Sequence, residues 1–293
     1  MTQTIDLVLT LVSRDGDASL LATRAPGATG GVSDRSGAGW SVAERNVAGG
    51  ADLVRWLDAE AASIGADWAI TPAGNRRKRL LISDMDSTII GQECLDELAD
   101  FAGLKAEVSA ITERAMRGEL DFAGALTQRV AMLKGLNLSA LEACHRERVR
   151  LNPGARELVA TMKAHGARCV LVSGGFRYFT SRVAQMAGFD ADRANTLIDD
   201  GAALTGQVGM PILGREAKLT ALLEETAAFG GSADDALAMG DGANDLDMIR
   251  AAGLGVAYKA KPIVAGETHA RIQHTDLRAA LFFQGYGVEE IAD

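Results

Sequence analysis

The chain has 293 residues, of which 47% are hydrophobic and 24% charged, which suits a globular protein with a well-buried core and excludes a disordered one. Its 30 Lys and Arg against 39 Asp and Glu give a net charge of −9. This balance disfavours a general binder of nucleic acid or anionic membranes, because both need a positive field. A small anionic substrate is compatible with this net charge, because a local site can be positive on a negative protein.

The cysteines and the hydropathy pattern indicate where in the cell the protein is expected. Cys94, Cys144 and Cys169 form no CxxC pair and are odd in number, so we expect ordinary small apolar residues in a reducing cytoplasm and no disulfide framework. The first ten residues lack the pattern of a signal peptide, and no apolar run approaches the roughly 20 residues of a membrane span. The sequence predicts a cytoplasmic protein with no membrane or nucleic-acid partner, and it predicts no oligomeric state.

Residues 1–76 read as a small N-terminal α/β appendage. A strand is predicted over residues 5–12, a Gly/Ser-rich loop over 27–39, a helix over 52–64 and a short strand over 67–70. The segment holds no cluster that looks catalytic, and a regulatory role is a hypothesis.

Residues 77–90 and 153–293 show the alternation of strands and helices that is typical of a parallel α/β sheet. Apolar runs at 79–83, 168–172 and 236–239 each end in small or acidic residues, and a helix follows each one. We therefore predict an α/β fold with a Rossmann-like parallel sheet as its core. Functional sites in such sheets lie beyond the carboxyl ends of the strands, so these three strand ends should converge.

The segment between these two parts of the core, residues 91–152, shows helical periodicity and is predicted to be a small helical cap inserted into the core. Within the core, a polar hairpin is predicted over 195–208 and helices over 155–165, 178–187 and 216–228.

Asp84 and Asp86 follow the first apolar run. A carboxylate is a competent nucleophile toward phosphorus, and a second carboxyl nearby can shuttle a proton if its pKa is raised. The alternative is an exposed turn, in which Asp is common, and a lone pair of this kind would favour that interpretation.

Asp241, Asn244 and Asp245 lie in a Gly-rich turn after another buried run. With Asp84 they offer the hard oxygen ligands that suit Mg²⁺. The alternative is a simple loop, but several acids gathered at the strand ends would repel one another without a cation.

Ser173 and Gly174 end a third strand, where a hydroxyl and free backbone N–H groups can cradle an anion. Lys218, near the start of a predicted helix, can balance both a phosphate and a nucleophilic carboxylate. Taken singly, Ser173-Gly174 is a common turn sequence, and Lys218 is a typical surface lysine.

These motifs occur in the order Asp84-Met85-Asp86-Ser87-Thr88, Ser173-Gly174, Lys218 and Gly240 to Asp245, and together they resemble the haloacid dehalogenase superfamily of phosphohydrolases. The segments 84–97, 116–133 and 152–154 further resemble the phosphoserine phosphatase family within it. The likeness covers most of residues 79–270 and leaves residues 1–76 outside.

The resemblance implies that Asp84 attacks the phosphorus and forms an aspartyl-phosphate, while Asp86 protonates the leaving oxygen and then activates water. It implies Mg²⁺ held by the Asp84 side chain, the Asp86 backbone carbonyl and the Asp241 side chain, with Asp245 orienting neighbouring groups. It assigns the phosphate to Ser173, Gly174, Lys218 and Asn244.

The cap would supply specificity. By resemblance, Glu93 binds the substrate ammonium, Arg129 binds its carboxylate, and Met116 and Phe122 line the pocket and exclude water. The alternatives are a helix-start acid for Glu93, a surface arginine for Arg129, and plain helix packing for the two apolar residues.

The implied activity is hydrolysis of O-phospho-L-serine, a small molecule, to L-serine and phosphate in serine biosynthesis. One alternative keeps the intermediate but transfers the phosphoryl group to another alcohol, such as homoserine. Another is a non-catalytic phosphoamino-acid sensor, which the presence of both Asp84 and Asp86 argues against.

Overall fold

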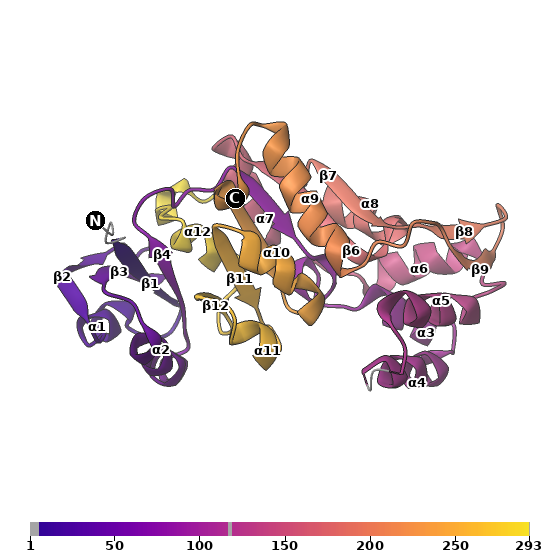
Figure 1. Ribbon diagram of the computed structural model, residues 1–293, viewed down its shortest axis with the longest axis horizontal. Helices are drawn as coiled ribbons and strands as arrows, with labels where there is room; N and C mark the ends of the chain where they lie inside the picture. The colour runs from indigo at the N-terminus through magenta and orange to yellow at the C-terminus, as the bar shows by residue number, and fades with distance from the viewer. Residues whose placement is uncertain (1–5, 117–118, 293) are drawn as a thin grey trace.

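The computed structural model describes residues 6–116 and 119–292 and is built on one ten-stranded sheet (Figure 1). Six strands form its parallel part, in the order β12-β11-β10-β5-β6-β7. Their bounds are Ala270–Ile272, Leu254–Tyr258, Ala236–Gly240, Leu80–Ser83, Arg168–Phe176 and Ala191–Asn195. The mostly parallel α/β core predicted from the sequence is confirmed.

The order of the parallel strands creates a switch point. From β5 the chain runs outward through β6 to β7, and it then returns to β10 on the other side of β5. The carboxyl ends of β5, β6 and β10 therefore lie side by side, where open α/β sheets place their ligands.

Helices cover both faces of this part, as parallel sheets require. The helices α9 (Arg215–Ala228) and α10 (Leu246–Ala251) pack on the face to which Leu80 and Ile82 point. The opposite face receives Leu81. It is covered by α7 (Ala155–Ala164), α8 (Arg177–Ala187) and α12 (Ala279–Phe283). The short helix α11 (Pro262–Ala265) follows β11.

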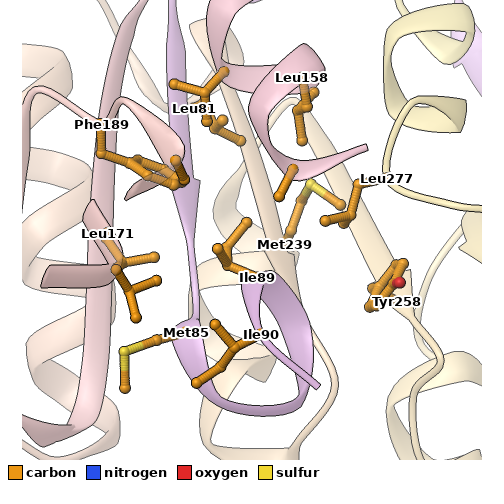
Figure 2. Close-up of a cluster of buried hydrophobic side chains, with 14 of the residues drawn as sticks. Leu81, Met85, Ile89, Ile90, Leu158, Leu171, Phe189, Met239, Tyr258 and Leu277 are labelled. Carbon is orange, nitrogen blue, oxygen red and sulfur yellow. The ribbon is translucent and has the colours of Figure 1, made fainter. Parts of the chain in front are cut away.

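The largest cluster of buried hydrophobic side chains among the described residues lies on that second face. Leu81, Leu171 and Met239 come from three neighbouring strands and belong to the same buried cluster as Leu158 of α7 (Figure 2). Met85, in the turn Met85–Ile89 directly after β5, is buried in the same cluster. The turn that carries the first acidic motif is thereby anchored in the core.

The N-terminal segment supplies the antiparallel part of the sheet, in the order β2-β3-β1-β4. The predicted strand, helix and second strand are confirmed as β1 (Leu7–Ser13), α2 (Ala51–Ser63) and β4 (Ala66–Pro72). A short helix α1 (Ala18–Thr23) and a strand β3 (Ser41–Val47) were not predicted.

The predicted loop over 27–39 is wrong, because β2 (Ala28–Asp34) occupies much of it and pairs with β3. β2 is an edge strand that is exposed along most of its length, so it carries no apolar alternation by which its sequence would reveal it.

The two parts of the sheet join where β4 pairs antiparallel with β12, Ala69 opposite Ala270 and Trp68 opposite Arg271. Beside this pairing, the buried carboxylate of Asp67 accepts hydrogen bonds from the backbone N–H groups of residues 273–275 at 2.6, 2.9 and 2.8 Å. The N-terminal segment is therefore held to the core by the sheet itself, and its status as a separate domain stays a prediction.

The described residues of the insert form four helices, α3 (Cys94–Phe101), α4 (Lys105–Met116), α5 (Phe122–Met132) and α6 (Leu138–Arg148). The predicted hairpin is confirmed as β8 (Leu197–Asp199) and β9 (Leu204–Val208), and the backbone of Leu204 bonds to Gly135 and Leu136 beside α5. The hairpin therefore packs with the cap. The insert lies at one end of the long axis and the N-terminal segment at the other (Figure 1).

No helix within the described part of the chain is long and apolar enough to cross a membrane. The three cysteines are buried and free, as expected for small apolar residues.

Candidate active site

A cluster of buried charged side chains lies at the switch point of the sheet. Asp84 follows β5, and Lys218 reaches it from α9 with its Nζ 2.7 Å from the Asp84 carboxylate and 2.6 Å from that of Asp245. All three residues are at most 5% exposed, so Lys218 is no surface lysine. A Cβ at Gly240 would lie 2.3 Å from the Asp245 carboxyl carbon, so only glycine leaves room for this arrangement.

The electrostatics of this cluster favour an added cation. Burial and the charge of Asp245 raise the pKa of Asp84 well above its usual value, although Lys218 opposes the shift. Burial by itself would lower the pKa of Lys218, but its two carboxylate partners raise it, so the ammonium stays charged.

Oxygens of Asp84, Asp241 and Asp245 lie within 4.8 Å of one another. Burial and Asp245 raise the pKa of Asp241 to about 6, which is the response of a carboxylate whose charge is not fully balanced. A cluster of hard oxygen donors with excess negative charge fits a divalent cation such as Mg²⁺.

Asp86 lies in the turn after Asp84, facing the same cavity. Its carboxylate accepts a hydrogen bond from the backbone N–H of Cys94 at 3.0 Å, at the start of the cap. Burial and the nearby charge of Glu93 raise the pKa of Asp86 to about 7. A carboxyl of this pKa can give and take a proton near neutral pH.

Ser173 and Gly174 lie where the pairing of β6 with β7 is interrupted, between Val172 and Phe176. The Ser173 hydroxyl accepts a hydrogen bond from the N–H of Gly175 at 2.9 Å and lies 3.4 Å from the Asp86 carboxylate. The Ser173 hydroxyl therefore faces the acidic pair, and Gly174 lines the same cavity.

The cap closes the cavity from the other side. Glu93, Phe122 and Arg129 line the same space of about 160 Å³ as Asp84 and Asp86. Glu93 stands at the start of α3 but makes no capping bond, and its carboxylate instead accepts the Ser87 hydroxyl at 2.7 Å. The side chain of Met116 lies outside the described residues.

The structure thus brings together all the predicted site residues whose side chains it describes. Asp84, Asp86, Glu93, Phe122, Arg129, Ser173, Gly174, Asp241 and Asn244 line the cavity, and Lys218 and Asp245 lie beneath Asp84.

Lys261, Ser87 and Asn195 are among the residues at the site that were not predicted. Lys261 lines the cavity, and the φ of 54° at Ser87 places that residue in the left-handed region, where strain is common at functional sites. Asn195 is buried, and its amide bonds the Gly174 carbonyl at 2.8 Å. A buried Asn at a strand end carries no local pattern, so only the fold identifies it.

Comparison with known proteins agrees with this geometry. The model of the haloacid dehalogenase-like hydrolase family matches residues 81–250, more than half of the chain. A protein of Polaromonas sp. named phosphoserine phosphatase is 48% identical over 204 residues, which cover 68% of this chain and 86% of that protein. A phosphoserine phosphatase of Streptomyces coelicolor is 43% identical over 237 residues. That match covers 80% of this chain but only 58% of the Streptomyces protein.

The likeness extends to the N-terminal segment in a solved structure. A haloacid dehalogenase family hydrolase of Salmonella enterica serovar Typhi superposes with a TM-score of 0.86 at 28% identity, covering 94% of this chain and 98% of that one. The switch-point acids, the matched family model and these relatives agree, and the chain belongs to the haloacid dehalogenase-like hydrolase family.

Proposed function

We propose that this chain hydrolyses O-phospho-L-serine to L-serine and phosphate, the last step of serine biosynthesis, through an aspartyl-phosphate on Asp84. The observation that carries the proposal is one cavity of about 160 Å³ in which the acidic pair Asp84 and Asp86 faces Glu93 and Arg129 of the cap. The first pair suits phosphoryl transfer, and the second suits the ammonium and carboxylate of an amino acid.

In the first half of the reaction, a carboxylate oxygen of Asp84 attacks the phosphorus as the bond to the serine oxygen breaks. Lys218 opposes the rise in the pKa of Asp84 and fixes the direction of its carboxylate through the 2.7 Å contact. Asp86 gives its proton to the departing serine oxygen, which its raised pKa allows near neutral pH.

In the second half, Asp86 takes a proton from water, whose oxygen attacks the phosphorus and releases Asp84 and phosphate. The Ser173 hydroxyl, the backbone at Gly174, Asn244 and Lys218 hold the phosphate oxygens and offset the charge that develops on them.

The metal is proposed to be Mg²⁺, held by the Asp84 side chain, the Asp86 backbone carbonyl and the Asp241 side chain, with Asp245 orienting the groups around it. When bound, it supplies positive charge to the phosphate oxygens and offsets the repulsion between these acids.

The cap residues account for the choice of substrate. Arg129 presents a planar fork to the substrate carboxylate, Glu93 pairs with its ammonium, and Phe122 excludes water from above, with Met116 proposed to complete the lining. Water is the acceptor in the relatives named as phosphatases, so transfer to another alcohol such as homoserine is not favoured. A non-catalytic sensor would need neither Asp84 nor Asp86, so the presence of both acids disfavours that alternative.

For the chain as a whole, we propose a core of residues 77–90 and 153–293, a specificity cap of residues 91–152 and an N-terminal unit of residues 1–76. Three buried free thiols are consistent with a cytoplasmic location.

The direct test is phosphate release from O-phospho-L-serine with and without added Mg²⁺, for the intact chain and for Asp84→Asn. Release that requires both the metal and Asp84 supports the proposal. A wild-type chain that ignores phosphoserine but cleaves another phosphomonoester would overturn the substrate and leave the chemistry in place.

A further inference from the structure

The ring of Phe122 separates two cavities. It lines the small active-site cavity of about 160 Å³ and also a larger outer cavity of about 1240 Å³. Gly174 lines the first cavity and Gly214 the second. Phe122 is 38% exposed.

The ring fits between these two glycines. A Cβ at Gly174 would lie 3.0 Å from the Phe122 Cζ, and a Cβ at Gly214 would lie 3.3 Å from its Cδ1 and 3.8 Å from its Cε1. Both nearest distances are shorter than ordinary van der Waals contact. The missing side chains therefore form a slot that admits the ring, and we call Gly174 and Gly214 the glycine slot.

One buried side chain fixes the two walls of the slot relative to each other. The amide of Asn195 donates to the carbonyls of Gly174 and Leu213 at 2.8 and 3.1 Å, and its oxygen accepts from the N–H of Leu213 at 2.7 Å. Asn195 is only 2% exposed. The width of the slot is thus set by the core and not by the cap.

Helix capping tolerates glycine at position 214 but does not require it. Gly214 is the N-cap of α9, where Ser, Thr, Asp or Asn would satisfy a free N–H. Its φ of −105° and ψ of −154° are extended and open to any L-residue. The contact with Phe122 is the feature that a side chain there would disturb.

We propose that Gly214 is a positioning residue for substrate specificity, which lets Phe122 close over the amino-acid part of the substrate. The inference rests on the proposed hydrolysis of O-phospho-L-serine. Gly214 does not line the cavity that holds the acidic pair, so we expect it to act on the substrate through Phe122.

The test compares Gly214→Ala, Gly214→Val and Gly214→Ser on two substrates, O-phospho-L-serine and p-nitrophenyl phosphate. We expect kcat/KM for phosphoserine to fall about 3-fold for Ala and about 10-fold or more for Val, mainly through KM, because misplacement by a fraction of an ångström weakens closure. Turnover of the aryl phosphate, which lacks the amino-acid part, should change less than about 2-fold.

Two variants separate this role from a structural one. Gly214→Ser gains a capping hydroxyl, so its melting temperature should not fall even as its phosphoserine KM rises. Gly31→Val is the matched control, because nothing lies within 4 Å of a Cβ at that glycine and it is in the distant strand β2.

A double-mutant cycle completes the test. In a Phe122→Ala background, Gly214→Val should cost less than about 2-fold further in kcat/KM for phosphoserine, because the ring it displaces is gone. Equal losses on both substrates, or an undiminished loss in the Phe122→Ala background, would place the effect in α9 and Lys218 and overturn the inference. A wild-type chain inactive on phosphoserine but active on the aryl phosphate would instead overturn the proposed function, and this inference with it.

Discussion

The N-terminal segment and the cap are both additions to the same parallel sheet, but they are attached in different ways. The first continues the sheet, through the β4–β12 ladder and the buried Asp67 carboxylate. The second meets the catalytic residues through individual side chains, such as Phe122 in the glycine slot and Glu93 on Ser87.

This difference assigns different tasks to the two regions. A hydrogen-bonded ladder resists displacement, so the N-terminal segment extends the scaffold. Side-chain contacts around a cavity separate more easily, as a closing cap requires. Changes in the cap should therefore alter substrate choice, and changes at the N-terminal junction should alter stability.

The largest effect is expected in the core that both regions share. Lys218→Ala removes the partner of two buried carboxylates, so phosphate release should fall by about 1,000-fold on phosphoserine and p-nitrophenyl phosphate alike. Stability should fall by about 3 kcal/mol in urea unfolding. A loss confined to phosphoserine would mean that Lys218 serves the cap.

Arg129→Ala sharpens the role of the cap. Without its guanidinium the substrate carboxylate is unpaired, and kcat/KM for phosphoserine should fall about 100-fold, with less than about 3-fold change for the aryl phosphate. Arg146→Ala is a matched change on helix α6 of the insert, at an exposed arginine, and should leave both substrates unaffected. Parallel losses on both substrates for Arg129→Ala would contradict a specificity role.

Asp67→Ala tests the N-terminal junction. It leaves three backbone N–H groups, one of them on the buried Thr275, without their carboxylate acceptor, so the free energy of unfolding should fall by about 2 kcal/mol while kcat/KM per folded molecule stays constant. Asp58→Ala is the control at the same junction. It removes the carboxylate that pairs with Arg271 and is more exposed than Asp67, so it should lower the free energy of unfolding by less than about 1 kcal/mol. If Asp67→Ala changed substrate choice instead, the division of tasks would be wrong.

The smallest effect is a shift in a pH profile. Asp86 must carry a proton to release serine, and its pKa of about 7 means that kcat/KM should decline as the pH rises above 7. Glu93→Gln removes a negative charge that raises this pKa, so the decline should begin at lower pH. A decline that moved to higher pH, or did not move, would show that Glu93 does not act on Asp86.

Much of the core and its site could be predicted from the sequence, because each motif follows a buried strand and parallel strands place their carboxyl ends together. Asp84, Ser173 and Asp241 are examples. The sequence around Lys218 does not indicate that this lysine is buried, because only the fold brings its two carboxylate partners to it.

The N-terminal strands were predicted less well for a physical reason. β2 is exposed along most of its length and so lacks alternation, and the pairing of β4 with β12 joins residues about 200 positions apart, which no local pattern records. Asn195 and Gly214 were missed because their importance lies in what they touch, which the sequence around them does not encode.

The most direct test is to quench the enzyme with acid while it turns over O-phospho-L-serine and to reduce it with borohydride, which converts an aspartyl-phosphate to homoserine with loss of phosphate, and then to locate the modified residue by mass spectrometry. The account predicts one modified residue, Asp84, and none in Asp84→Asn. A modification of another residue, or turnover with no trapped intermediate and full activity in Asp84→Asn, would contradict it.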